Sequence, residues 1–560
     1  MSHQSLNKTF TLSALSAAVL LCTALPAQAF QFDTGNSDLR VRLDTNVKYT
    51  AAWRVKDQMN RLIADPTLDD GDRNFDKGSM INNRLDLFSE FDVNYRGMGA
   101  RVSGAAWYDR VYNRRNDHDN PGTANSLSVR YNEFTKETRD LHGRDAEIRD
   151  AFVYSDFDLT DDIWGVVRVG QHSLLYGESL FFGNNGIAGG MMPINAIQAL
   201  SVPNSQFKEL VLPVKQLSGE LQLTPALSVG AYYQLEWERT RIPAAGSYFS
   251  PADLLDGGGE RILAVAGDPQ ISLYRTKDIE ARDSGQWGMQ LRYRADQIGT
   301  EFGLYAIRYH DKNFQVQTRP FAGPPQPGQV GDLVVGEYML VFPEDIKAYG
   351  FSANRGIGSA NVGFEASTRR NAPLVSLTVT DLAGNRDNRS NPLYAVGNTA
   401  HAQINMITIL PKGQFWDTAA LLGEVAWNRT LSVTKNREWL DPNNTRDATA
   451  MRVVFTPTYF QVFDGVDLSV PMGVSYGLDG RSSAVGGFSQ AKGGGFNVGV
   501  SAEYLKRVTV SLSYNGFYGP SDRTSRPEFV PAIGAVTGVK TYKQTNGDRD
   551  FISLNASYTF

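Results

Sequence analysis

The feature that most constrains this chain is a period-two alternation of apolar and polar residues, repeated in segments of about ten residues. Between Arg84 and Tyr95, the apolar side of the alternation consists of Leu85, Leu87, Phe91, Val93 and Tyr95. The same pattern returns at 227–237, 287–293, 496–504 and 552–560. Successive side chains of a β-strand point to opposite faces, so each segment has one apolar and one polar face.

Eighteen such segments are expected, and their connections alternate between long and short. The predicted strands are 38–54, 81–96, 99–112, 144–158, 163–171, 214–223, 226–237, 284–295, 300–311, 346–355, 359–370, 398–410, 414–429, 449–463, 466–478, 495–505, 508–518 and 548–560. Short turns on one rim and long loops on the other are typical of bacterial outer-membrane barrels, whereas a water-soluble multi-domain β-protein predicts no such regularity. The sequence therefore predicts an all-β, transmembrane antiparallel barrel of 16–18 strands.

The first 29 residues predict a secretory signal peptide. Lys8 precedes an apolar run from Leu12 to Leu25, and Ala27-Gln28-Ala29 has the A-x-A form of a cleavage site. The run is shorter than the ~20 residues of a spanning helix, which disfavours a retained anchor. We expect cleavage near Ala29, a mature barrel of residues 30–560 and a location in the bacterial outer membrane.

Charge and cysteine content exclude several classes of protein. The 55 Lys and Arg residues against 60 Asp and Glu give a net charge of -5. The chain therefore lacks the basic excess that would indicate a nucleic-acid partner. The one cysteine, Cys22, lies in the predicted signal peptide, which excludes a disulfide framework and thiolate metal sites.

One predicted loop, residues 172–213, is nearly free of charge, since only Glu178, Lys208 and Glu209 are charged. Its apolar side chains would form a costly patch in water. We expect this insert to fold into the barrel as a lumen constriction or plug, with hinges in Gly183–Gly190; packing on a neighbouring subunit or on lipid is the alternative. The candidate constriction residues are Gln171, Glu178, Ser179, Phe181, Phe182, Met191, Met192, Asn195, Lys208 and Glu209.

The polar faces of the predicted strands carry both signs of charge. The residues expected to point inward include Arg84, Asp86, Glu90, Glu236, Glu238, Arg292 and Arg294. A channel for phosphate or other anions would favour a lining of Arg and Lys. A mixed lining beside an apolar constriction suits amphipathic or apolar solutes better than small ions.

Signals for catalysis or cofactors are weak. His172 and Ser179 lie seven residues apart, but no G-x-S-x-G elbow follows a strand. Asp69-Asp70-Gly71-Asp72 with Asp76 clusters oxygen ligands but misses the EF-hand spacing, so a solvated or lipopolysaccharide-facing loop is the simpler interpretation. We expect no enzyme activity, no cofactor and no metal site.

Several short stretches resemble the outer-membrane family catalogued as domain of unknown function 1302. They are Arg168–Gln171, Gly177–Phe181, Ile194–Ala196, Lys208-Glu209 ahead of Leu212-Pro213, Tyr233–Trp237 with Thr240, and Gly246–Phe249. Family members usually carry Trp where this chain has Tyr176. The resemblance implies an outer-membrane protein often found with a companion lipoprotein, efflux-type transporters and the metabolism of hydrophobic compounds or polyesters.

Two functions follow as hypotheses. The first is an outer-membrane channel for passive uptake of hydrophobic or aromatic small molecules, gated by the insert. The second is a non-transport component in envelope biogenesis or adhesion that presents its long loops. The partners expected are outer-membrane lipid and lipopolysaccharide, a small hydrophobic solute and the companion lipoprotein that the resemblance implies.

Overall fold

The computed structural model describes residues 30–203, 205–265, 270–322, 326–327 and 332–560. The predicted signal peptide, residues 1–29, lies outside the described residues. Among the described residues, no helix is both long enough and apolar enough to cross a membrane.

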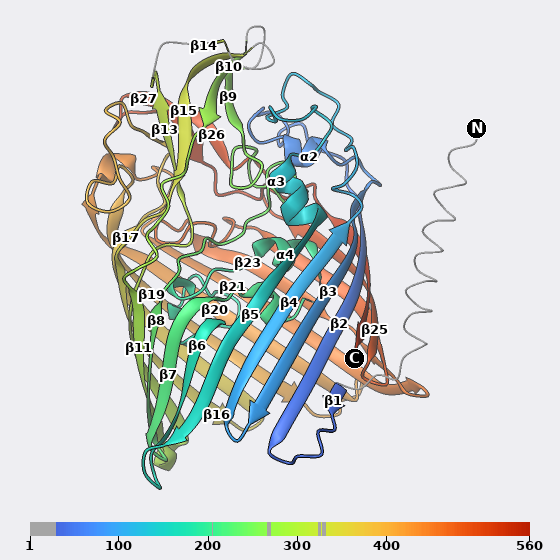
Figure 1. The fold of residues 1–560 in the computed structure, drawn as a ribbon. Helices are drawn as coiled ribbons and strands as arrows, with labels where there is room; N and C mark the ends of the chain where they lie inside the picture. The colour runs from blue at the N-terminus through green and yellow to red at the C-terminus, as the bar shows by residue number, and fades with distance from the viewer. Residues whose placement is uncertain (1–29, 204, 266–269, 323–325, 328–331) are drawn as a thin grey trace.

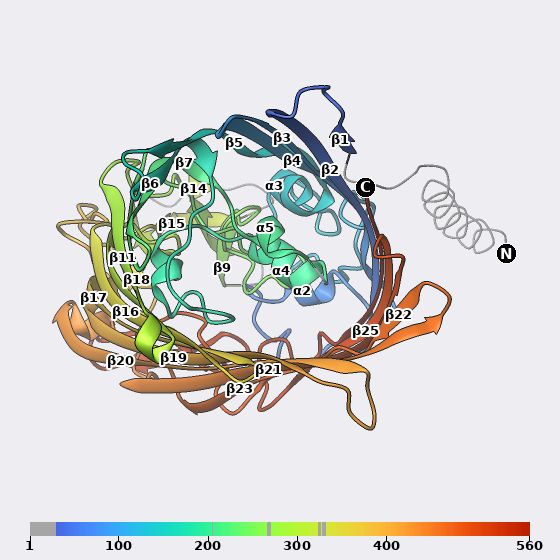
Figure 2. The same cartoon turned by 90° about the horizontal axis from the view of Figure 1, so that it is seen from below.

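The described chain forms a closed antiparallel β-barrel of eighteen strands, which confirms the predicted fold class (Figures 1 and 2). In ring order the strands are β2 (Leu39–Arg54), β3 (Met80–Tyr95), β4 (Met98–Asp109), β5 (Arg144–Asp158), β6 (Trp164–His172), β7 (Val214–Thr224), β8 (Leu227–Gln234), β11 (Gln286–Ala295), β12 (Thr300–Tyr309), β16 (Ile346–Ile357), β17 (Ala360–Pro373), β19 (Val396–Leu410), β20 (Thr418–Lys435), β21 (Asp447–Phe463), the broken strand β22 (Val466–Ser469) and β23 (Met472–Gly480), β24 (Gly494–Tyr504), β25 (Val508–Tyr518) and β28 (Phe551–Thr559). β28 pairs with β2 and closes the ring, while β1 (Phe30–Phe32) pairs with β2 beyond the end of β28.

Short turns and long loops are segregated to opposite rims, here called the short-turn rim and the long-loop rim (Figure 1). Arg96 and Gly97 join β3 to β4 with φ angles of 50° and 83°. Two residues with positive φ make the type of tight turn that matches the twist of a hairpin. The C-terminus lies at the short-turn rim, as expected for an even number of strands that begin and end on one side.

The outer face of the barrel carries the apolar half of the alternation. On β11, Met289 and Leu291 are 57% and 37% exposed, whereas Gln290 between them is half-buried on the lumen side. The same faces repeat on β24, where Val498 and Val500 are exposed outward. An outward apolar belt around a closed barrel is typical of barrels surrounded by lipid. In water, such a belt would have to be covered by a second layer of protein around the barrel.

The prediction that Glu236 and Glu238 point into the lumen from a wall strand is wrong, because β8 ends at Gln234. Trp237, predicted to face outward, is instead buried against Phe342, with ring centroids 4.9 Å apart. This packing draws the chain away from the wall. Glu236 pairs with Lys215 at 2.8 Å. The alternating pattern in the sequence thus extends beyond Gln234, where the strand itself ends.

The long-loop rim carries structure that the alternation does not predict. A second sheet stands above the barrel and consists of β9 (Arg261–Val265), β10 (Ile271–Arg275), β13 (Gln315–Pro320), β14 (Gln326–Pro327), β15 (Leu333–Val341) and β18 (Val379–Thr380) (Figure 1). A separate hairpin joins β26 (Ser525–Val530) to β27 (Ala535–Lys540). The described helices are short and lie in loops: α2 (Asp70–Arg73), α3 (Lys136–Thr138), α4 (Ala196–Ser201) and α5 (Phe207–Leu210).

The assignment of faces on β11 predicts the effect of a charge. Leu291→Arg places a guanidinium on the lipid side, where it should cost about 2–4 kcal/mol of folding free energy near the midplane. Gln290→Arg, one residue away on the lumen side, should leave the folded yield close to that of the parent. Heat-modifiable migration on gels measures the folded fraction of each, and equal yields would contradict the facing.

Candidate functional site

The insert, residues 172–213, lies inside the ring of strands, where Figure 2 shows α4 and α5 within the lumen. Its residues Tyr176, Ile187, Met191 and Met192 are buried against the inner wall. Their wall partners on β8, β12 and β16 include Tyr232, Tyr305, Ile307, Tyr309 and Ile346. Burying each large apolar side chain contributes roughly 1.5–3 kcal/mol, so this cluster is a major force holding the insert inward.

Glu424 on β20 holds one stretch of the insert through three backbone groups. The carboxylate accepts hydrogen bonds from the N–H groups of Leu180 at 3.2 Å, Phe182 at 2.9 Å and Phe181. Glu424 is 2% exposed. Hydrogen bonds to a charged group are about twice as strong as neutral ones, so this carboxylate fixes the path of the insert.

Glu365 on β17 holds the flanking stretch in the same way. Its carboxylate accepts from the N–H of Glu178 at 2.8 Å and from the N–H of Ile187 at 2.6 Å. Gly177 has a φ of 95°, and a side chain there would collide with the Glu365 carboxylate. Glycine at this position is therefore required both by the backbone conformation and by the close approach to the anchor.

The two residues after Gly177 contact the same part of the wall. Glu178 accepts a hydrogen bond from Asn354 of β16 at 2.7 Å, and Ser179 accepts one from Gln403 of β19 at 2.8 Å. The Gly-Glu-Ser motif is thus the segment that docks on the wall strands β16, β17 and β19. Its conformation is fixed by hydrogen bonds to the wall.

The other end of the insert is held by the opposite side of the barrel. Lys208 pairs with Glu90 of β3, and Glu209 pairs with Lys48 of β2 at 2.9 Å. Asn195 accepts a hydrogen bond from the N–H of Gln198 and so caps α4. β3 and β17 are nine strands apart in either direction around the ring, so the insert spans the lumen from wall to wall.

An aromatic and cationic surface remains open inside the lumen. Phe181 and Phe182 are half-buried, and the Phe182 ring lies 5.5 Å from that of Phe488. The guanidinium of Arg452 on β21 lies 4.9 Å from the centre of the Phe181 ring. Arg452 is exposed. These side chains can contact a solute, unlike the buried ones of the cluster.

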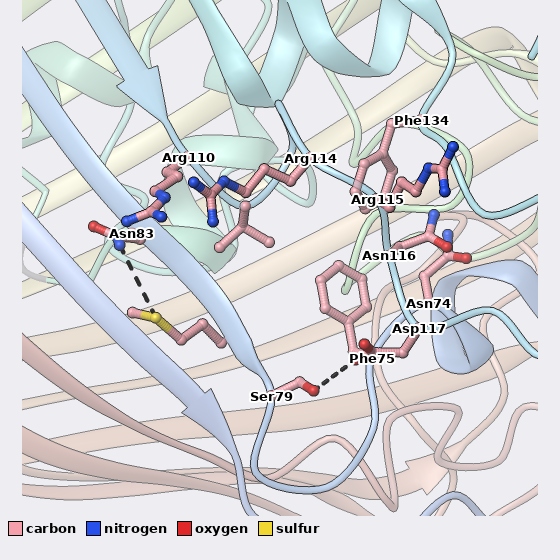
Figure 3. Close-up of a pocket in the computed structure, with 12 residues that line it drawn as sticks. Asn74, Phe75, Ser79, Asn83, Arg110, Arg114, Arg115, Asn116, Asp117 and Phe134 are labelled. Atoms are coloured by element: carbon pink, nitrogen blue, oxygen red, sulfur yellow. Dashed lines mark hydrogen bonds between the residues drawn. The ribbon is translucent and has the colours of Figure 1, made fainter. Parts of the chain in front are cut away.

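Two cavities flank the ends of the lumen. One of about 600 Å³ lies at the short-turn rim beneath α5 and is lined in part by Phe88, Glu90 and Lys208. The other, of about 280 Å³, lies near the long-loop ends of β3 and β4. Figure 3 shows Arg110, Arg114 and Arg115 in its lining. The other lining residues are Asn74, Phe75, Ser79, Met80, Asn83, Val111, Asn116, Asp117 and Phe134. The arginines give this second cavity a basic character.

The predicted site residues separate into three groups. Glu178, Ser179, Phe181 and Phe182 lie together in the stretch docked on the wall. Met191 and Met192 lie in the buried cluster, and Asn195, Lys208 and Glu209 lie at the opposite wall.

Gln171 lies outside the lumen, which corrects its assignment to the constriction. It shares the outward face of β6 with the exposed Val169. Its side chain donates to the carbonyl of Arg149 at 2.7 Å, where the pairing of β4 and β5 shifts register. Gln171 therefore stabilises an irregularity of the wall.

The anchors Glu365 and Glu424 and the cation Arg452 were missed by sequence reasoning. A signal existed for Glu424, because it is the one charged residue in 418–428, in the middle of a long wall strand. An isolated acid on a lumen face needs a partner, and backbone N–H groups of an insert can provide it. Which insert it meets is a matter of tertiary structure.

His172 and Ser179, the two residues considered for catalysis, have different hydrogen-bond partners. His172 bonds Ser218 of β7 at 2.7 Å, whereas Ser179 bonds Gln403. Neither residue therefore provides the other with the base or nucleophile of a hydrolase.

Comparisons with known proteins identify a family. The sequence profile described as "Protein of unknown function (DUF1302)" matches residues 10–560. No curated protein matches the chain significantly. Among solved structures, the outer membrane channel DcaP of Acinetobacter baumannii is similar with a TM-score of 0.36 and 9% identity over 95% of this chain and 100% of that chain. OccAB4 of the same organism is similar with a TM-score of 0.41 and 10% identity over 95% of this chain and 100% of that chain.

The role of the carboxylate anchors is testable in the folded barrel. Glu424→Gln should weaken the docking of the insert by about 1.5–3 kcal/mol, because an amide presents one acceptor and two donors to three N–H groups. Chymotrypsin should then cut the folded protein at Phe181 or Phe182. Glu503→Gln, on the lumen face of β24, is the control and should remain as resistant as the parent. Equal resistance of all three proteins would show that Glu424 does not hold the insert.

Proposed function

The chain belongs to the family described as "Protein of unknown function (DUF1302)", and on that premise we propose that it is an outer-membrane channel for passive uptake of small aromatic or hydrophobic molecules. The observation that carries the proposal is the insert, which crosses the lumen and presents Phe181 and Phe182 there. An eighteen-stranded barrel is otherwise wide enough for an aqueous channel. A narrowing with an aromatic surface selects among solutes by contact as well as by size.

The chemistry around Phe181 favours aromatic solutes that carry a negative group. Aromatic rings stack on or pack edge-to-face against Phe181, Phe182 and Phe488. The guanidinium of Arg452 provides a charged partner for a carboxylate next to those rings. An aromatic carboxylate satisfies both contacts, whereas an aliphatic acid of similar size satisfies one.

The outer membrane is the location that the surface of the barrel supports. The belt of outward apolar residues requires lipid, and the alternation of short turns with long loops matches barrels whose turns face the periplasm. We accordingly assign the short-turn rim to the periplasm and the long-loop rim to the cell exterior. Lipid and lipopolysaccharide are then the surroundings of the barrel, and the companion lipoprotein stays a prediction.

Selective transport is tested with a double variant in planar bilayers. The parent should conduct benzoate better than hexanoate, and Phe181→Ala/Phe182→Ala should raise total conductance while reducing that preference. Loss of a cation–π and stacking contact of about 0.5–1 kcal/mol corresponds to a factor of about two to five. Arg452→Ala should reduce the preference for benzoate over the aromatic cation benzylammonium, which carries current but has no carboxylate for Arg452 to bind.

Phe460→Ala is the matched control, since Phe460 is exposed on β21 and should leave selectivity unchanged. A parent protein that folds normally but conducts none of these solutes would contradict the channel. That outcome would favour a role in envelope biogenesis or adhesion.

A further inference from the structure

Three loops bring acidic side chains together above the long-loop rim. Asp69 and Asp70 lie in the β2–β3 loop at the start of α2, and Asp253 lies in the β8–β9 loop. One carboxylate oxygen from each lies within 4.8 Å of the others. The three residues are 0%, 8% and 1% exposed, so water does not solvate this concentration of charge.

Neighbouring cations compensate the cluster only in part. Arg73 pairs with Asp69 at 2.5 Å, and His118 of the β4–β5 loop contacts Asp70 at 3.1 Å. Asp253 accepts a hydrogen bond from the backbone N–H of Asp70 at 3.1 Å. Burial, and then repulsion from Asp70, raises the pKa of Asp69 to about 7, and the same causes raise the pKa of Asp253.

Four buried oxygen atoms around the cluster receive no hydrogen bond from any residue that the structure describes. They are Asp69 Oδ1, Asp253 Oδ1, Asn74 Oδ1 and Asn125 Oδ1. The orientation of both amides is fixed, because Asn74 donates to the carbonyl of Gly246 at 2.7 Å and Asn125 to that of Thr123 at 3.1 Å. The free atoms are therefore acceptors, which together can bind a cation.

A small cavity lies between these groups. Its volume is about 20 Å³, and Asp70, Asn74, Asn125 and Asp253 all line it. A space of about 10–15 Å³ or more holds a single water-sized particle. The two amides thus border the same cavity as two of the carboxylates, and this observation is independent of the acidic cluster itself.

A second group of possible ligands, His310, Glu344 and Asp345, differs in its surroundings. Arg282, Arg308 and Arg389 pair with Asp345 at 2.5, 2.7 and 3.1 Å. Those guanidinium groups satisfy the carboxylates, so that group needs no metal ion.

We propose that Asp69, Asp70 and Asp253, with Asn74 and Asn125, bind a calcium ion. The ligand atoms are all carboxylate and amide oxygens, which Ca²⁺ prefers. The ring of His118 is not among the ligands, because it is hydrogen-bonded to Asp70. Ca–O distances of about 2.3–2.6 Å allow one ion to join oxygens up to about 5 Å apart, in keeping with the spacing of the carboxylates. Mg²⁺ demands a stricter octahedron and fits an irregular set of loop ligands less well.

The ion would fasten three loops to one another. Asp69 and Asp70 come from the β2–β3 loop, Asn125 from the β4–β5 loop and Asp253 from the β8–β9 loop. Extracellular calcium modules bind with dissociation constants of about 10⁻⁴–10⁻³ M, which suits loops outside the cell. The inference is independent of which solute the lumen admits.

Metal binding can be measured on the full-length barrel in detergent after treatment with EDTA and dialysis. Tyr131 also lines the cavity and can sensitise the luminescence of Tb³⁺, which replaces Ca²⁺. We expect one Tb³⁺ per chain, displaced by CaCl₂ more effectively than by MgCl₂. Asp253→Asn should weaken binding about tenfold or more, while Asp161→Asn, at an exposed short turn, should not change it.

Heat-modifiable migration establishes that each variant is folded. Limited proteolysis of the parent provides a measurement that needs no variant, since CaCl₂ should protect the β2–β3 and β4–β5 loops from cleavage. The proposal is overturned if the parent binds no Tb³⁺ saturably, or if folded Asp253→Asn binds as tightly as the parent. In either case the cluster is not a metal site.

Discussion

Two buried carboxylates on the inner wall determine how the lumen is organised. A chain segment that crosses a barrel outside any sheet has backbone N–H groups that need acceptors. Glu365 and Glu424 accept five of them, from Glu178, Leu180, Phe181, Phe182 and Ile187. The carboxylates in turn need donors, because a buried charge without partners is costly. Wall and insert therefore stabilise each other.

The wide barrel and the charge-poor insert depend on this arrangement. The apolar cluster around Met191 holds the insert against β12 and β16, but apolar contacts are not directional. The hydrogen bonds to Glu365 and Glu424 fix the register, and the ion pair of Glu209 with Lys48 fixes the opposite end. Phe181 and Phe182 are thus held at defined places in the lumen. A surface at a fixed place can discriminate among solutes, whereas a mobile loop cannot.

Local patterns predicted the wall well. The bounds of β5 and β25 agree with the prediction residue for residue, because a period of two and the turn residues are local features. The low charge of the insert is the local feature from which inward folding is predicted. The partners of the insert were not predictable, because Glu365 and Glu424 lie far along the chain. Likewise Asp69 and Asp70 form one visible motif, but Asp253 joins them only through packing of the loops.

Cross-linking tests most directly whether the insert crosses the lumen docked on the β17–β20 wall. Residues 30–560 contain no cysteine, so introduced thiols report without background. Ser179→Cys and Gln403→Cys replace side chains whose polar atoms lie 2.8 Å apart, and a short bifunctional thiol reagent should cross-link them in the folded barrel. Ser179→Cys with Ala105→Cys, on β4 at the opposite side of the ring, should not cross-link. Cross-linking of the second pair, or of neither pair, would contradict the docked insert.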